Sequence, residues 1–130
     1  MNMITYGSGT SEDPWVLKTP SHGSDYEAWK DPDTDPAALV VQVRKTRLSY
    51  QWRAIEDLAA MLKAHGDWMP LGTADEGKPV KEGTVEAWAR DPANPVGGYY
   101  GLRKGYRGRF GNYVPPVLEL LGLADLEHNA

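Results

Sequence analysis

The strongest constraint on the fold is a change in hydrophobic spacing midway along the chain. Residues 39–43 read Leu-Val-Val-Gln-Val, a run rich in the β-branched side chains that favour strands. After a turn at residues 44–45, apolar and polar side chains alternate over residues 47–53, and this period of two predicts a half-buried strand. Over residues 55–62 the apolar positions recur at helical spacing instead. This order predicts a β-hairpin followed by a helix that ends at Gly66.

Two further strands are expected before the hairpin, at residues 15–19 and 25–30, with a turn-prone stretch between them. The sequence DPDTDP at residues 31–36 interrupts regular structure, because proline lacks the amide hydrogen that strand pairing needs. Residues 1–13 are polar and rich in Gly and Ser, so we expect a flexible N-terminal arm. Residues 14–130 are enough to bury the core of one globular domain.

The second half of the chain predicts mainly helices. Residues 84–90 and 117–121 are expected to be helical, and Pro115 suits the start of the second of these. Short strands are expected at residues 68–71 and 123–127. We therefore predict an α+β fold in which an antiparallel sheet, built mainly from the N-terminal half, carries about three helices of the C-terminal half on one face.

The composition excludes several classes of protein. The chain has no cysteine, which removes disulfides, thiolate nucleophiles and cysteine-based metal sites and fits a reducing cytoplasm. No stretch approaches 18 consecutive apolar residues, and the N-terminus lacks the basic and apolar regions of a signal peptide. A net charge of −4 argues against indiscriminate binding of nucleic acid. We expect a cytoplasmic protein without a membrane span.

Residues 96–113 read VGGYYGLRKGYRGRFGNY and are the most unusual segment of the chain. They hold six glycines, five aromatic and four basic residues with no acid, which leaves the rest of the chain at a net −8. On a helical wheel the glycine, aromatic and basic residues fall on three separate faces, which favours a helix over residues 96–109. Its interior glycines would cost that helix roughly 3–4 kcal/mol relative to alanines. The alternative is an irregular loop in which glycines adopt positive φ and present backbone amides to an anion.

The basic side chains of this segment form the candidate ligand site. Arginine presents a fork of donors to phosphate or carboxylate, and tyrosine can stack on a base or ring. The candidate ligand-binding residues are Arg103, Lys104, Arg107 and Arg109, flanked by Tyr100 and Tyr106. In the alternative interpretation these cations pair with acids of the chain itself, such as Asp57, Asp75, Glu76, Glu82 and Glu86.

Candidate catalytic and metal sites are weaker, and we assign no catalytic residue, no metal ligand and no cofactor. His22, His65 and His128 do not share a turn or a strand in the predicted fold, so a zinc site would need all three brought together or help from a carboxylate. The acidic spacing at residues 31–35 resembles the start of a calcium loop but lacks the glycine and the glutamate that such a loop needs.

Three classes of function stay open. We favour a non-catalytic binding module that contacts an anionic small molecule or an acidic protein partner through residues 96–113, with nucleic acid a less favoured ligand. The alternative is a protein–protein or self-association domain, which the abundance of Trp and Tyr would serve. A second alternative is a small enzyme with His65 and carboxylates in a Trp-lined cleft.

Three stretches of the sequence resemble a family of small, uncharacterised bacterial proteins. They are GSGTSEDPWVLKTPSHGSDYEAW near the start, LKAHGDWMPLG in the middle and NPVGGYYGLRKGYRGRFGNYVPPVLELLGLADLEHN at the end. Together they cover most of the chain. The resemblance implies a free-standing bacterial cytosolic protein and, since the family has no assigned activity, substrate or cofactor, it assigns no catalytic residue.

Overall fold

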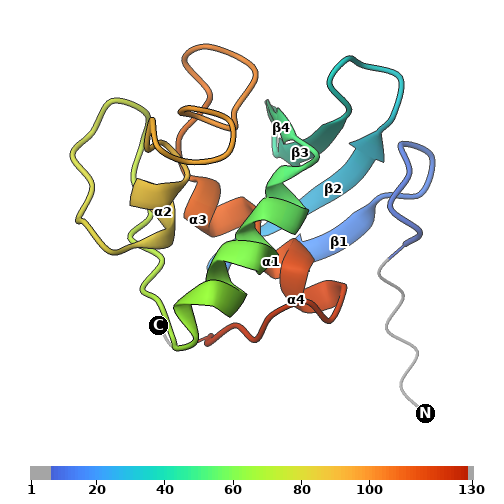
Figure 1. The fold of residues 1–130 in the computed structure, drawn as a ribbon. Coiled ribbons are helices and arrows are strands. Elements are labelled where there is room, and N and C mark those ends of the chain that lie inside the picture. The colour runs from blue at the N-terminus through green and yellow to red at the C-terminus, as the bar shows by residue number, and fades with distance from the viewer. Residues whose placement is uncertain (1–6, 129–130) are drawn as a thin grey trace.

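The computed structural model of the protein describes residues 7–128, which form one sheet with helices against one of its faces (Figure 1). The strands are β1 (Trp15–Lys18), β2 (Asp25–Asp31), β3 (Ala38–Val43) and β4 (Thr46–Gln51). They pair antiparallel in chain order, β1-β2-β3-β4. The predicted α+β class and the N-terminal origin of the sheet are therefore confirmed.

The hairpin of β3 and β4 has the register that the sequence alternation predicts. Val41 lies opposite Leu48, and Leu39 lies opposite Tyr50. Because side chains in a strand alternate between faces, these four point to the same side of the sheet, and all four are buried in the main core. The pattern read from the sequence thus identifies the buried face correctly.

Four helices cover that face within the described residues. They are α1 (Ala54–His65), α2 (Val85–Trp88), α3 (Phe110–Tyr113) and α4 (Pro115–Leu120). Each contributes to the main core, through Leu58, Val85, Phe110 and Leu118 respectively. None of the helices between residues 7 and 128 has the length and apolar character needed to cross a membrane.

Two predicted strands are wrong. Residues 68–71 and 123–127 are irregular, and each stretch follows a helix that ends at a glycine with positive φ, Gly66 or Gly122. The backbone of the first stretch is used differently: the Val85 and Glu86 N–H groups donate to the Pro70 and Leu71 carbonyls at 2.9 Å each. This pairing attaches α2 to residues 68–71 and leaves no ladder for a strand.

Part of the predicted N-terminal arm is described. Residues 1–6 lie outside the described residues, whereas residues 7–13 form a turn in which the Ser8 and Gly9 N–H groups donate to the Asp13 carbonyl at 3.0 Å. The Gly9 carbonyl accepts a hydrogen bond from the Lys30 N–H at 3.0 Å. Residues 7–13 are thereby attached to β2.

A buried carboxylate holds the second half of the chain together. The side chain of Glu86 in α2 is 1% exposed, and its Oε1 accepts the Gly111 N–H at 2.8 Å while its Oε2 accepts the Phe110 N–H at 3.2 Å. These amides belong to the first turn of α3. Burial raises the pKa of Glu86, and the hydrogen bonds from Gly111 and Arg90 oppose that rise.

Arg90 extends this network to the loop of residues 73–83. Its Nη2 lies 3.2 Å from Glu86 Oε2 and also donates to the Ala74 and Asp75 carbonyls at 3.3 Å. Its Nη1 donates to the Lys78 carbonyl at 3.0 Å. One acid and one arginine, four residues apart, therefore hold α2, α3 and a long loop in a fixed relation.

We predict that Glu86→Ala lowers the free energy of unfolding by about 3–5 kcal/mol, because it leaves a buried guanidinium and two buried amides without their acceptor. Urea unfolding followed by tryptophan fluorescence measures this change. Glu82→Ala, at an exposed position four residues earlier, is the matched control and should change stability by less than about 0.5 kcal/mol. Equal effects of the two substitutions would contradict the role given to Glu86.

Candidate functional site

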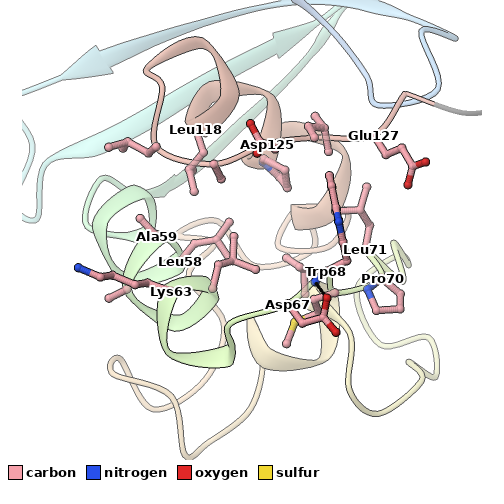
Figure 2. A pocket seen from close by; sticks show the side chains of 18 of the residues that line it. Leu58, Ala59, Lys63, Asp67, Trp68, Pro70, Leu71, Leu118, Asp125 and Glu127 are labelled. Carbon is pink, nitrogen blue, oxygen red and sulfur yellow. Dashed lines mark hydrogen bonds between the residues drawn. The ribbon is translucent and has the colours of Figure 1, made fainter.

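A wide concave surface lies between α1 and the C-terminal tail (Figure 2). We call it the tail groove; its walls are α1, residues 66–71, and residues 123–127 together with Leu118. Its volume is about 1110 Å³, and most of its lining side chains are apolar. In Figure 2, Leu58 of α1 lies across the groove from Leu71 and Leu118.

Both non-helical walls begin where a glycine ends a helix. Gly66 has a φ of 75° and its N–H donates to the Leu62 carbonyl, which ends α1 and turns the chain back along it. Gly122 has a φ of 74°, and the Leu123 N–H that follows donates to the Leu118 carbonyl at 2.9 Å. The same device thus places residues 66–71 and residues 123–127 on two sides of one groove.

Trp68 is the largest exposed apolar side chain at the groove. Its side chain is 63% exposed. Its backbone is nevertheless fixed, because its N–H donates to Asp67 Oδ1 at 2.7 Å and its carbonyl lies 3.3 Å from His65 Nε2. The backbone of Trp68 is therefore fixed while its indole is open to solvent, and together with the exposed Leu123 it forms an apolar surface of the kind that marks a contact site.

The charges at the groove are mostly negative. Asp67, Asp125 and Glu127 are acidic lining residues, and Lys63 is the basic one. All four are exposed, so they form a rim around an apolar floor. The groove therefore combines apolar surface with a net negative edge.

The predicted helix over residues 96–109 is wrong, and the loop alternative holds. Residues 98–109 form an irregular loop that doubles back on itself, with one isolated bridge between Gly101 and Tyr50 of β4. A Cβ on Gly101 would lie 2.6 Å from the Arg107 Cα, so this glycine permits the two arms of the loop to touch. Glycines and cations separate on a helical wheel, which favours a helix. A loop whose two arms touch at Gly101 and Arg107 also needs a glycine at that position.

Arg107 is paired with an acid of the same chain. Its Nη2 and Nε lie 3.2 Å and 3.3 Å from the carboxylate oxygens of Glu76, which also accepts the Arg107 N–H at 2.7 Å. The Gly105 N–H donates to the same carboxylate at 3.1 Å. The hydrogen bond from Arg107 lowers the pKa of Glu76. The Glu76 carboxylate therefore accepts the hydrogen bonds that the loop would otherwise offer to an external anion.

Arg109 is paired in the same way, since its Nε lies 2.6 Å from Asp75 Oδ1. A smaller cleft of about 340 Å³ runs between the β3–β4 hairpin and this loop, and Asp75, Glu76, Tyr106 and Arg109 all line it. Arg107 and Arg109, two of the four predicted anion-binding cations, therefore already have carboxylate partners, and both of these acids line the cleft.

Tyr100 faces the core. Its side chain is 1% exposed, packs beside Trp88 and Phe110, and donates its hydroxyl to Asp57 Oδ2 at 2.9 Å. Burial, with the Asp57 hydrogen bond and charge adding to it, raises the pKa of Tyr100. The tyrosine thus anchors the loop on α1 and has no open ring face for a ligand.

The remaining three predicted residues form an exposed tip of the loop, which we call the basic tip: Arg103, Lys104 and Tyr106. The Arg103 guanidinium carbon lies 4.2 Å from the Tyr106 ring centroid, and that tyrosine is 39% exposed. Among the described residues, neither Arg103 nor Lys104 forms an ion pair. The six predicted residues therefore fall into three groups. Arg107 and Arg109 form ion pairs at the base of the loop, and Tyr100 is buried. Arg103, Lys104 and Tyr106 form the exposed basic tip.

The other polar candidates are spread over the molecule. Glu82 is exposed while Glu86 is buried in the core network, so the two do not share a pocket. The His22 and His128 rings are 4.3 Å apart, which the sequence separation gave no reason to expect. Within residues 7–128, no group of three or more His, Asp or Glu side chains is suited to hold a metal ion.

Sequence reasoning missed the tail groove. The sequence carries one signal for it: Trp68 lies two residues after Gly66 and Leu123 directly after Gly122, so in both places apolar residues come soon after a helix-ending glycine. Apolar residues at such positions also fit the short strands that the sequence predicts. They line a groove instead.

Comparison with known proteins identifies the family and nothing closer. A family model described as "Family of unknown function (DUF6855)" matches residues 7–130. The chain therefore belongs to this family, which confirms the resemblance of the three stretches of sequence to a family without an assigned function; a bacterial origin stays a prediction. No curated protein and no solved structure matches the chain significantly.

We predict that Glu76→Ala loosens the loop of residues 98–109 without unfolding the domain, because the Gly105 and Arg107 amides lose their acceptor. Hydrogen exchange at those two amides measures the change and should be faster in the variant. The pKa of Glu76 is lowered in the fold, so its contribution is present above the ordinary glutamate pKa and is lost as the pH falls through the lowered value. Glu82→Ala is the matched control; unchanged exchange in Glu76→Ala would contradict the assignment.

Proposed function

We propose that this member of the DUF6855 family is a non-catalytic binding module whose tail groove holds an apolar ligand that carries a positive charge. The observation that carries the proposal is the groove itself, an apolar floor between α1 and the tail with a net negative rim. Small-molecule sites are typically concave, about 300–1,000 Å³ in volume and mostly apolar, with a few polar groups that orient the ligand. The groove is concave and mostly apolar with a few charged groups at its edge, and its volume of about 1110 Å³ is slightly above that range.

The exposed indole of Trp68 supports binding. Leaving a large aromatic side chain in water costs free energy that a bound apolar group would recover. Leu123, on the opposite wall, is 49% exposed, so apolar area is available from both sides. Residues of this kind, at the centre of a contact surface, contribute most of the binding free energy in known interfaces.

The rim supports the sign of the ligand's charge. Asp67 and Asp125 lie at the groove, and Lys63 is the one opposing charge among the lining residues. A cation placed between carboxylates at the edge of a low-dielectric floor gains Coulomb energy, whereas an anion there would be repelled. An amine or quaternary ammonium attached to an alkyl or aromatic body matches both parts of the groove.

The charged residues of the groove favour binding over catalysis. General acid–base catalysis needs a titratable group held against the reacting bond in a desolvated position. The charged residues of the groove are at its exposed rim. We further propose a bacterial cytoplasm as the compartment, because a chain without cysteine needs no oxidising environment.

We predict that decyltrimethylammonium, below its micelle concentration, binds the tail groove at least about tenfold more tightly than decyl sulfate, a difference of about 1.4 kcal/mol. NMR chemical shifts of the lining residues locate the site, and calorimetry gives both affinities. Trp68→Ala should weaken the cationic probe by about tenfold or more. Leu102→Ala removes another exposed apolar side chain, on the loop of residues 98–109, and is the matched control.

The charge of the rim is tested separately. Asp67→Asn keeps the acceptor for the Trp68 N–H but removes the charge, so it should reduce the preference for the cation, and Asp33→Asn should not. Equal affinity for the two probes would overturn the cationic class of ligand. Shifts confined to other surfaces would overturn the groove, and dimers that Trp68→Ala abolishes would make it a self-association surface.

A second function is favoured by a separate observation, the unpaired charges of the basic tip. We propose that Arg103 and Lys104, beside the Tyr106 ring, contact an anionic ligand or an acidic protein partner. Arg107 and Arg109 have a supporting role in this proposal, since their ion pairs with Glu76 and Asp75 fix the base of the loop. Interaction between exposed charges is weak and falls with ionic strength, so such contact would be transient.

We predict that the double variant Arg103→Ala, Lys104→Ala weakens binding of a hexaglutamate peptide at low salt, and that raised salt abolishes the difference from the unmodified protein. The measurement is a fluorescence anisotropy titration at two ionic strengths. Lys78→Ala with Lys81→Ala removes the same number of positive charges from another exposed loop and is the matched control. Equal loss in both double variants would show attraction by net charge alone and exclude the basic tip.

A further inference from the structure

We propose that His128 is a pH-dependent latch that holds the C-terminal wall of the tail groove closed and releases it as the pH rises. This inference concerns the regulation of the groove, and its importance for binding rests on the proposed function. Residues 123–127 line the groove, and His128 follows directly after them. What fixes His128 therefore helps to hold that wall in place.

The imidazole of His128 lies between two acceptors. Its Nδ1 is 3.0 Å from the Pro20 carbonyl oxygen, and its Nε2 is 2.7 Å and 3.0 Å from the carboxylate oxygens of Glu119 in α4. A carbonyl and a carboxylate accept hydrogen bonds and donate none. Both ring nitrogens must therefore carry a proton for both bonds to form, and an imidazole with two N–H groups is the cation.

Loss of one proton breaks this arrangement. A neutral imidazole has one N–H group, so it can satisfy Pro20 or Glu119 but not both, and the ion pair with Glu119 is lost in either case. The hydrogen bond that His128 donates to Glu119 raises the pKa of His128 above its ordinary 6.5, and the bond to the Pro20 carbonyl adds to the rise. The closed tail is thus favoured fully below the ordinary histidine pKa, and that preference is lost as the pH rises through the raised value.

The charged neighbours set the range of the latch. Glu119 favours the cation, and Glu127 is the adjacent acid on the tail. The His22 ring, from the β1–β2 turn, lies 4.3 Å from the His128 ring at a tilt of 31°. The His128 cation therefore lies between the Glu119 carboxylate and a second imidazole ring.

The tail is attached at both ends of the wall. At its start the Leu123 N–H donates to the Leu118 carbonyl at 2.9 Å, and this backbone bond does not depend on pH in the physiological range. At its end the His128 ring binds Pro20 and Glu119. Release of His128 removes the side-chain hydrogen bonds that hold the tail at residue 128, and this weakens the closed position in which Ala124 and Leu126 line the groove.

Because binding and proton uptake are linked, a ligand that needs the closed wall must bind more tightly at low pH and must raise the pKa of His128 when bound. The largest effect is set by the difference in that pKa between closed and open tails, at about tenfold in affinity for each unit. The latch thus converts a rise in pH into loss of ligand.

The test is an NMR titration of the unmodified protein from pH 5.5 to 9, which follows the His128 ring carbons and the Leu123 and Leu126 methyl groups without any probe. We expect the methyl shifts and the ring to titrate together, with a midpoint above 6.5. Glu119→Gln should lower that midpoint. His128→Gln should abolish the methyl titration, and Glu27→Gln, at an exposed position of β2, is the matched control for Glu119→Gln.

Two results would overturn the latch: methyl groups that stay fixed while His128 titrates, or a His128 midpoint that Glu119→Gln leaves unchanged. Decyltrimethylammonium is then titrated at pH 6 and pH 8.5, where the latch predicts weaker binding at the higher pH in the unmodified protein and no such change in His128→Gln. If the probe does not bind at all, the proposed function fails while the tail titration still decides the latch.

Discussion

The hydrogen bonds of one buried carboxylate, Glu86, and of its partner Arg90 underlie the arrangement of α2, α3 and the loop of residues 73–83. Helices α2 and α3 have four residues each, far below the length at which a helix is stable alone in water. They persist because α3 begins on the Glu86 oxygens and because Arg90 gathers the carbonyls of the adjoining loop. Apolar burial then adds to a geometry that polar contacts specify.

Carboxylates also fix the backbone of the basic segment. A loop made largely of glycine and aromatic residues has little to fix its backbone, and here Glu76 and Asp75 fix it through Arg107 and Arg109. The local excess of positive charge is in large part the complement of an acidic loop elsewhere in the chain. Positive charge is left over only at the basic tip, where Arg103 packs on the Tyr106 ring.

The sheet and α1 could be predicted from the sequence because their signals are local. Period-two alternation defines β4, and Gly66 ends α1 as expected. The rest depends on contacts between distant residues. The sequence alone predicts that Glu86 is a solvent-exposed helix residue, because it does not show the contact with Gly111. It also places Gly101 in a glycine face of a helix, because it does not show that Arg107 packs against this glycine. The spacing of apolar residues does not reveal a groove whose two irregular walls are separated by more than fifty residues. For this reason the sequence predicts strands at Trp68 and Leu123.

The two candidate surfaces are physically independent. The loop that carries the basic tip and the C-terminal tail lie at opposite ends of the molecule in Figure 1, and the core separates them. They also differ in sign, since the tip is cationic and the rim of the groove is mostly acidic. A ligand suited to one is repelled by the other, so the two proposals do not compete for the same occupant. The groove has the stronger physical basis, because burial of apolar surface holds a ligand at any salt concentration whereas contact with exposed charges does not.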